Sequence, residues 1–252
     1  MKIGLLSLGC PKNLVDGEVM LGLAQSAGHE LTNDASDADV LVVNTCAFID
    51  AAKQESIDAI LEMAQQKVNG RCSRLVVTGC LAERYRDELK KEIPEIDAVL
   101  GTGEVERILD VVGTRSSEAT PREVPVAPLT FHRNGSALLG KKPGSREAGP
   151  SASPALPTYL YDADTPRLLT TPKHFAYVKI AEGCDYTCAF CIIPQIRGGM
   201  VSRTLDAIVR EAEVLAAQGT REVILIGQDP NRYGVDLREE GSGHLLPRLL
   251  ER

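Results

Sequence analysis

Positive charge and long apolar runs are both scarce in this sequence. Lys and Arg number 28 against 35 Asp and Glu, which gives a formal net charge of −7. That balance argues against a broad basic surface built to neutralise phosphates, so nucleic acid is an unfavoured partner, although a local RNA contact is still allowed. No apolar run approaches membrane-spanning length, and the apolar start, soon followed by Lys12 and Asp16, is too short for a signal peptide. We therefore expect a cytoplasmic protein without a membrane segment.

The remaining composition is that of an ordinary soluble protein. The 252 residues are 43% hydrophobic and 25% charged, enough for one large or two modest domains, and we expect two. Seven cysteines without a secretory signal indicate reduced thiols for metal binding or catalysis rather than a disulfide framework.

The most informative motif is CDYTCAFC at residues 184–191, which places three cysteines within eight residues. Three such thiolates form a ligand set that soft metals or an iron–sulfur cluster favour. Structural zinc sites and the usual cubane clusters take four protein ligands. Either a fourth ligand therefore comes from elsewhere in the protein, or one coordination position stays open. Zinc is the weaker alternative, because none of the four histidines lies within nine residues of the motif.

Residues 1–115 alternate short β-branched runs with helical stretches, which predicts an α/β domain with an open parallel sheet covered on both faces. One helix is expected to open near Asn13 and to end before Gly28. The other expected elements are strands at 2–8, 40–44, 75–78 and 98–100 and helices at 51–67, 81–91 and 104–112.

Three of the four expected strands end in a cysteine, namely Cys10, Cys46 and Cys80. Because the carboxyl ends of parallel strands share one edge of an open α/β sheet, where ligands bind, we expect these cysteines to meet in space. The alternative is that each is a small buried hydrophobic residue. Chance would scatter such residues among strand interiors and helices, which disfavours that alternative. Cys72 lies away from any strand end and is interpreted as incidental.

Residues 116–171 are expected to form an interdomain linker. The stretch 133–157 is rich in Gly, Pro and Ser, and it cannot bury enough apolar surface to offset its ordering entropy. We therefore predict a flexible connection between domains at 1–115 and 172–252.

The periodic pattern returns in residues 172–252. Thr204 suits the N-cap of a helix, and Gly219 suits its C′ stop. The turn Gly227-Gln228-Asp229 ends the second strand at the edge from which the cysteine loop leaves the first. A β/α/β unit of the kind that builds (β/α) barrels is thus expected, with a strand at 175–180, a helix at 204–218 and a strand at 222–226.

With both cysteine sets in view, the chain resembles the radical S-adenosylmethionine (SAM) methylthiotransferases almost from end to end, apart from the linker. Members of that family have an N-terminal α/β domain with a second three-cysteine cluster, followed by a radical SAM (β/α) barrel. They insert sulfur into an unactivated C–H bond and methylate it, using one SAM as methyl donor and another as radical source. The resemblance implies that residues 172–252 form the first part of such a barrel.

The resemblance also assigns roles to individual residues. It implies two 4Fe–4S clusters, each with one iron that lacks a cysteine, and SAM at the open iron of the loop cluster. The ligands would be Cys184, Cys188 and Cys191 for the SAM-binding cluster and Cys10, Cys46 and Cys80 for the auxiliary cluster. The SAM contacts would be Tyr186, Phe190, Gly227, Gln228 and Asp229. Arg197 would be a carboxylate or substrate contact or, as loop arginines more often are, a solvated surface residue.

Short motifs favour one branch of the family. Residues 7–16 (SLGCPKNLVD) and 191–198 (CIIPQIRG) are similar to the RimO-type branch, which modifies the β-carbon of an aspartate in a small-subunit ribosomal protein. The branch that modifies an adenosine in transfer RNA typically follows Gly-Cys with Gln-Met-Asn. Two alternatives remain open: the transfer-RNA activity, and a metal-binding or electron-transfer module without radical chemistry.

Further expectations follow from the resemblance. The partners would be a ribosomal protein substrate, a sulfur donor and a low-potential flavodoxin or ferredoxin as reductant. Members of the family carry more β/α repeats and a C-terminal TRAM domain, which this sequence lacks. We therefore expect an incomplete form that loads its second cluster site poorly and does not turn over alone.

Overall fold

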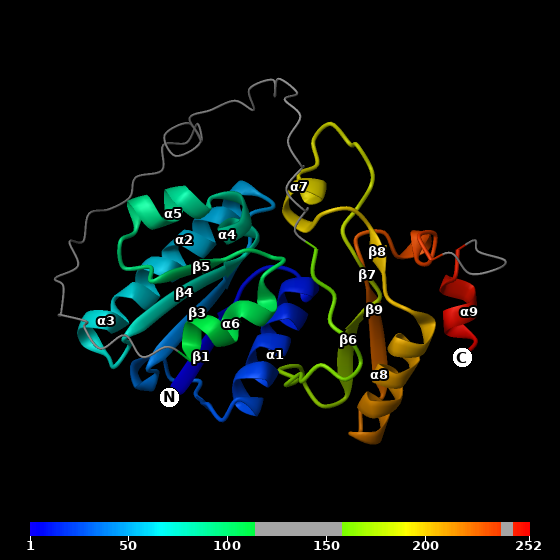
Figure 1. The fold of residues 1–252 in the computed structure, drawn as a ribbon, viewed down its shortest axis with the longest axis horizontal. Coiled ribbons are helices and arrows are strands. Elements are labelled where there is room, and N and C mark those ends of the chain that lie inside the picture. The colour runs from blue at the N-terminus through cyan, green and yellow to red at the C-terminus, as the bar shows by residue number, and fades with distance from the viewer. Residues whose placement is uncertain (114–157, 238–243) are drawn as a thin grey trace.

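The computed structural model describes residues 1–113, 158–237 and 244–252 (Figure 1). The N-terminal part contains a five-stranded sheet in the order β2-β1-β3-β4-β5, with every neighbouring pair parallel. The strands are β1 (Lys2–Ser7), β2 (Glu30–Leu31), β3 (Val40–Thr45), β4 (Arg74–Gly79) and β5 (Ala98–Leu100). The four predicted strands are confirmed, and β2 is an additional edge strand of only two residues.

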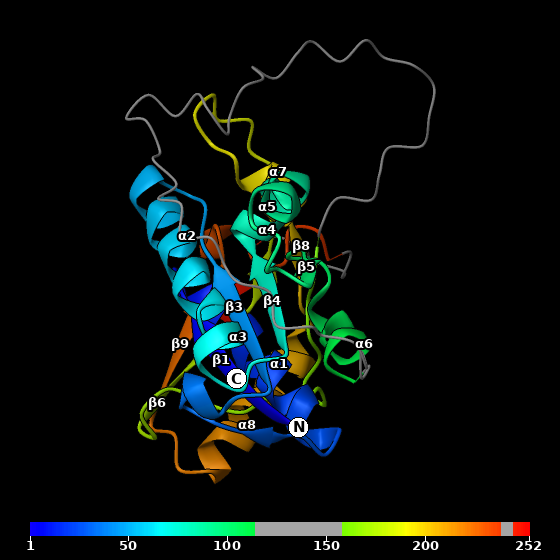
Figure 2. The ribbon, with the colours of Figure 1, turned by 90° about the vertical axis from the view of Figure 1, so that its left-hand side faces the viewer.

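Alternate residues of β3 pack on opposite faces of this sheet, as the period of a strand requires. Leu41 and Val43 join a core with the helix α2 (Asp50–Ala64). Val40 and Val42 join a second core with α1 (Pro11–Ser26) and α6 (Ile108–Val112). Figure 2 shows α2 and α6 on opposite sides of the sheet. The predicted open parallel α/β sheet, covered on both faces, is therefore confirmed.

The predicted helices that follow α1 in this domain are interrupted. A short α3 (Gln66–Asn69) follows α2, and a 3-10 turn, η2 (Val105–Arg107), precedes α6. Tyr85 leaves the helical region, with φ −131° and ψ 35°, and separates α4 (Cys80–Arg84) from α5 (Arg86–Glu92). A further 3-10 turn, η1, spans Ala35–Asp37. No helix in the described parts of the chain is both long and apolar enough to cross a membrane.

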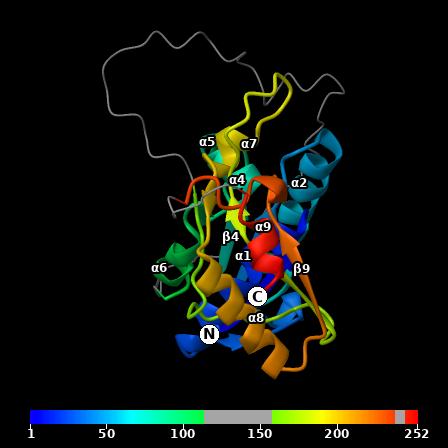
Figure 3. The same ribbon diagram turned by 90° about the vertical axis from the view of Figure 1, so that its right-hand side faces the viewer.

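The C-terminal part is a parallel β/α/β unit, as predicted. The two strands pair with Phe175 opposite Glu222, and the Thr204 side chain caps the connecting helix. Figure 3 shows this unit from its outer side. Its main elements are β6 (Phe175–Lys179), α8 (Leu205–Ala217) and β9 (Glu222–Ile226). Smaller elements complete it: β7 (Ala181–Glu182) antiparallel to β8 (Val201–Ser202), α7 (Ile193–Arg197), η3 (Pro230–Arg232) and α9 (Leu246–Leu250).

Residues 158–171, which the sequence places in the linker, pack against both parts of the protein. Tyr159 and Tyr161 are buried in the core that contains α1 and α6. Arg167 forms ion pairs with Glu18 of α1 and Glu211 of α8, both at 2.6 Å. The Gly- and Pro-rich stretch 133–157 expected to be flexible lies outside the described residues.

Candidate metal centre

The three cysteines predicted to meet do follow three adjacent strands. Strands β1, β3 and β4 are neighbours, and Thr45 pairs with Gly79, so Cys46 and Cys80 leave the sheet at the same level. The strands lie about 4.8 Å apart, as parallel strands do. On the other side of β3, the N–H of Leu8 donates to the carbonyl of Asn44 at 2.8 Å, which aligns the segment that carries Cys10.

The Cys10 segment approaches Cys46 closely. A Cβ added at Gly9, which has φ +93°, would lie 2.8 Å from Cys46 Cβ, so this approach requires glycine. Burial raises the pKa of the Cys80 thiol, the Arg197 guanidinium opposes this shift, and the sulfurs of Cys10 and Cys46 raise the pKa further. The three thiols therefore lie within one another's electrostatic reach at the carboxyl edge of the sheet.

The second cysteine set lines an open pocket of about 470 Å³. Hydrogen bonds from Cys184 N–H to Gly198 carbonyl at 3.1 Å and from Cys191 N–H to Cys188 carbonyl at 3.0 Å shape the loop. The other residues in the lining are Asp185, Tyr186, Thr187, Ala189, Pro194, Gln195 and Gly199. Phe190 is outside this lining and is 92% exposed.

The donor chemistry of both sets suits an iron–sulfur cluster. All seven cysteines are free thiols, and soft sulfur is the ligand that such clusters prefer. Among the described residues, no three His, Cys, Asp or Glu side chains gather closely enough to hold a single metal ion. Cys72 is elsewhere: it is buried, and its Sγ donates to the Arg74 carbonyl at 3.2 Å.

The turn after β9 lies beside the cysteine loop. Gln228 Nε2 donates to Glu182 Oε1 at 2.5 Å, two residues before Cys184. A hydrogen bond to Asp229 raises the pKa of the Tyr186 hydroxyl. A Cβ at Gly227 would meet the Ala181 carbonyl at 3.7 Å, an ordinary contact. The structure thus brings the 227–229 turn, Tyr186 and the loop cysteines to one edge.

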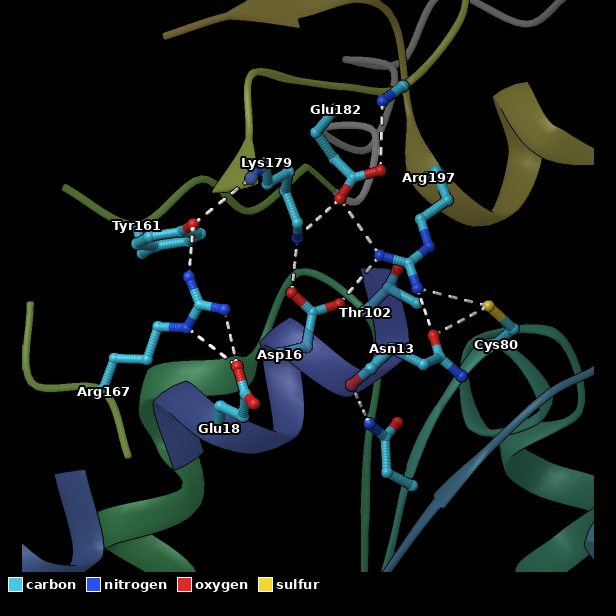
Figure 4. A network of polar contacts seen from close by, with 12 residues as sticks. Asn13, Asp16, Glu18, Cys80, Thr102, Tyr161, Arg167, Lys179, Glu182 and Arg197 are labelled. Atoms are coloured by element: carbon cyan, nitrogen blue, oxygen red, sulfur yellow. Dashed lines mark hydrogen bonds and ion pairs between the residues drawn. The ribbon is translucent and has the colours of Figure 1, made fainter. Parts of the chain in front are cut away.

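Arg197 is buried, so its interpretation as a solvated surface residue is wrong. It is 2% exposed, and its Nη1 contacts Asp16 Oδ2 at 2.8 Å and Glu182 Oε2 at 3.0 Å (Figure 4). Its Nη2 contacts Cys80 Sγ at 3.6 Å and also Asn13 Oδ1. The guanidinium therefore touches the α1 region, the loop region and a strand-end cysteine at once.

Lys179 and Lys12 add two cations to this charged network, which no sequence motif predicts. Lys179 is fully buried, and its Nζ lies 2.5 Å from Asp16 Oδ1 and 2.7 Å from Glu182 Oε2. Burial lowers the pKa of Lys12 to about 8. Burial also opposes ionisation of Glu182, but the charges of Lys179 and Arg197 outweigh it and hold the pKa of that carboxyl well below its usual range. Because these partners come from distant parts of the sequence, no local pattern announces the network.

Comparisons with known proteins agree with this architecture. Residues 2–101 match the model of the uncharacterized protein family UPF0004, and residues 178–240 match that of the radical SAM superfamily. The structure resembles the radical SAM methyltransferase TsrM from Kitasatospora setae, solved with cobalamin and a [4Fe-4S] cluster, with a TM-score of 0.50 and 17% identity. That likeness covers 91% of this chain and 48% of the other, and it concerns the fold alone.

Curated relatives are much more similar in sequence. The ribosomal protein uS12 methylthiotransferase RimO of Koribacter versatilis is 52% identical over 99% of this chain and 52% of its own length. The protein of the same name from Solibacter usitatus is 49% identical over the whole chain and 47% of its own length. The chain is therefore similar over almost its whole length to the RimO-type radical SAM methylthiotransferases, and it spans about half the length of the curated relatives it matches.

Proposed function

We propose that this chain is the cluster-binding half of a radical SAM methylthiotransferase that acts on an aspartate β-carbon of ribosomal protein uS12. The observation that carries the proposal is that two three-cysteine sets lie on either side of one buried network of ion pairs. One set follows β1, β3 and β4, the other lines the pocket beside β9, and Arg197 and Glu182 lie between them. The substrate assignment is supported by the name of the relatives and by the motifs around the cysteines.

In this proposal Cys184, Cys188 and Cys191 hold one 4Fe–4S cluster, and Cys10, Cys46 and Cys80 hold the other. When bound, the first cluster with SAM supplies a radical for C–H activation, and the second supplies the sulfur. The open pocket leaves the loop set accessible to a small cofactor. In the other set Cys46 and Cys80 are buried and Cys10 is exposed, so that set lies at the boundary between the protein interior and water.

The residues after β9 would orient the methionine end of SAM. Gln228 is held by Glu182, and Asp229 accepts a hydrogen bond from Tyr186, so both polar groups are fixed before the cofactor arrives. Phe190 is exposed and unpacked, which leaves its ring free to cover a bound cofactor. The chain's net charge of −7 favours a protein substrate over a polyanionic nucleic acid.

Anaerobic reconstitution of the chain with iron and sulfide tests the two cluster sites. Two four-iron clusters correspond to roughly eight irons per chain at full loading, and because the chain alone is expected to load its second site poorly, we expect an iron content between roughly four and eight. Cys184→Ala and Cys46→Ala should each lose one cluster and keep the other, while Cys72→Ala, the matched buried cysteine, should keep both. Loss of both clusters in either single variant, or zinc in place of iron, would contradict the proposal.

The substrate is tested with a chimera that joins this chain to the remaining half of the Koribacter versatilis relative. With SAM and a reduced flavodoxin, we expect mass spectrometry to find a methylthio group on an aspartate of purified uS12. The same reaction on transfer RNA should give no product. A methylthiolated adenosine instead would assign the chain to the transfer-RNA branch, and clusters without SAM cleavage would indicate an electron-transfer module.

A further inference from the structure

An unbroken line of polar contacts connects the turn after β9 to the strand-end cysteines. Gln228 Nε2 donates to Glu182 at 2.5 Å, Glu182 accepts from Arg197 Nη1 at 3.0 Å, and Arg197 Nη2 donates to Cys80 Sγ at 3.6 Å. Arg197 ends α7, which begins two residues after Cys191 and packs against α4, whose first residue is Cys80. The loop cysteines and the strand-end cysteines are thus joined through one side chain.

The contact with Cys80 is more than a by-product of ion pairing. Asp16 and Glu182 already share Lys179, which is fully buried between them. The planar fork of Arg197 directs Nη1 to those carboxylates and leaves Nη2 for Cys80 and Asn13. A lysine at position 197, with a single ammonium group, could not serve both sides of this fork.

A cation donating to a cysteine sulfur has a defined effect on an iron–sulfur cluster. The reduction potential of a cluster depends on its type, its net charge, the hydrogen bonds to its sulfurs and its solvent exposure. The hydrogen bond from a guanidinium to a ligating thiolate is charge-assisted. Arg197 is only 2% exposed, so water screens this interaction little. Reduction adds negative charge to the cluster, so a fixed positive charge favours the reduced form.

We propose that Arg197 is a positioning residue for the auxiliary cluster: it donates to the sulfur of Cys80, holds that ligand in place against α7, and raises the cluster's reduction potential. The inference rests on the proposed function, because it requires a cluster on Cys10, Cys46 and Cys80. It adds to that function the residue through which the two cluster regions are coupled.

The test uses the full 252-residue chain with Cys184, Cys188 and Cys191 all replaced by Ala, so that only the auxiliary cluster is loaded. The midpoint potential of that cluster is measured by redox titration followed by electron paramagnetic resonance. Arg197→Gln removes the charge, and Arg197→Lys keeps it but loses one arm of the fork. Arg203→Gln is the matched control, because Arg203 is buried and paired with Glu211 at 2.5 Å but touches no cysteine.

We expect Arg197→Gln to shift the midpoint to more negative values, Arg197→Lys to shift it less in the same direction, and Arg203→Gln to leave it unchanged. Should Arg197→Gln fail to fold, the lysine variant decides: a negative shift supports the inference, and an unchanged midpoint overturns it. Equal shifts in the Arg197 and Arg203 variants also overturn it, because they indicate a general loss of packing. A parent chain that binds no iron at Cys10, Cys46 and Cys80 overturns the proposed function itself.

Discussion

Gly79 connects β4 to Cys80 with φ +92°, a backbone conformation that residues with a Cβ rarely adopt. An added Cβ would lie 2.5 Å from the Thr45 carbonyl oxygen of β3. We predict that Gly79→Ala lowers the free energy of unfolding by more than about 2 kcal/mol, since roughly 1–2 kcal/mol of strain adds to a backbone clash. The measurement is urea unfolding at pH 7, together with the iron content of the auxiliary set, which should fall.

Gly28 provides the matched control for that substitution. It also has a positive φ, +84°, but an added Cβ would have no neighbour within 4 Å. Gly28→Ala should therefore lower the free energy of unfolding only by the backbone strain, roughly 1–2 kcal/mol, and should leave the iron content unchanged. Equal losses of stability in the two variants would mean that the strands move apart at Gly79 without cost.

Single residues differ in how far the sequence reveals their role. Cys46 and Cys80 were predictable together, because equivalent positions on adjacent parallel strands meet at one edge. Arg197 was not, since its partner Asp16 is 181 residues away and exposed loop arginines are the common case. Burial of a charge is decided by partners brought together in three dimensions, which local patterns do not encode.

At the scale of elements, the N-terminus of α8 depends on Thr204, whose hydroxyl accepts from the Ala207 N–H at 3.3 Å. We predict that Thr204→Ala destabilises the chain by about 1 kcal/mol, because that N–H loses its partner. Thr204→Ser keeps the hydroxyl, so its stability should stay close to that of the parent chain. Thermal unfolding followed by circular dichroism gives both values, and a serine variant as unstable as the alanine variant would refute the capping role.

The segment 158–171 should make stability depend on pH in the alkaline range. Burial, and next the charge of Glu211, raise the pKa of Tyr161 well above its ordinary value. Its hydroxyl therefore stays protonated in the folded chain while unfolded chains ionise near pH 10. This contribution is complete below about pH 10 and is lost as the pH rises toward the folded pKa.

Urea midpoints between pH 8 and pH 11 test this dependence. Tyr161→Phe cannot ionise, so its midpoint should fall less steeply with pH than that of the parent chain. The variant should also be less stable at pH 8, because the hydroxyl donates to Glu211 at 2.9 Å in the folded chain. Parallel pH profiles for the two proteins would contradict the assignment.

Long elements with a clear period were predictable, and short ones were not. Strand β9 and the helix α8 appear close to where the apolar run at 223–226, Thr204 and Gly219 place them. The two-residue ladder of β7 and β8 carries no period, because two residues cannot show alternation. The break at Tyr85 and the order in residues 158–171 arise from tertiary packing, which overrides local propensity.

At the scale of the whole molecule, buried ion pairs hold the N-terminal sheet domain to the C-terminal β/α/β unit. Lys179 of β6 binds Asp16 of α1, and Arg167 joins Glu18 of α1 to Glu211 of α8. Charges that are removed from water tolerate relative movement poorly, because every displacement leaves an unpaired charge. The two cysteine sets are thereby kept at a fixed separation. Apolar packing adds to this, because Ile196 of α7 lies in the core that contains α2, and Tyr177 of β6 packs against the core that contains α1.

Glu18 offers the sharpest test of this coupling. Its side chain has no exposure, and it accepts from Arg167 at 2.6 Å and from both the N–H and the hydroxyl of Thr170, at 2.7 and 2.9 Å. Replacement by Gln removes one of the two carboxylates that pair with Arg167. It should lower the free energy of unfolding by about 3–5 kcal/mol, as the breaking of a buried ion pair does. We expect Glu18→Gln to separate a single urea transition into two, because the sheet domain would unfold independently of the β/α/β unit.

Far-ultraviolet circular dichroism and tyrosine fluorescence, recorded on the same samples, reveal such a separation, since coincident curves indicate two-state unfolding. Lys53→Gln is the control. Its partner Asp50 is 96% exposed, so the free energy of unfolding should fall by less than about 1 kcal/mol. If the two unfolding curves of Glu18→Gln still coincided, and its loss of stability were no larger than that of Lys53→Gln, the pair of Glu18 with Arg167 would be dispensable. The cohesion of the two cysteine sets would then come from Asp16, Lys179 and Arg197 and from the apolar packing of Ile196 and Tyr177 against the cores of the sheet domain.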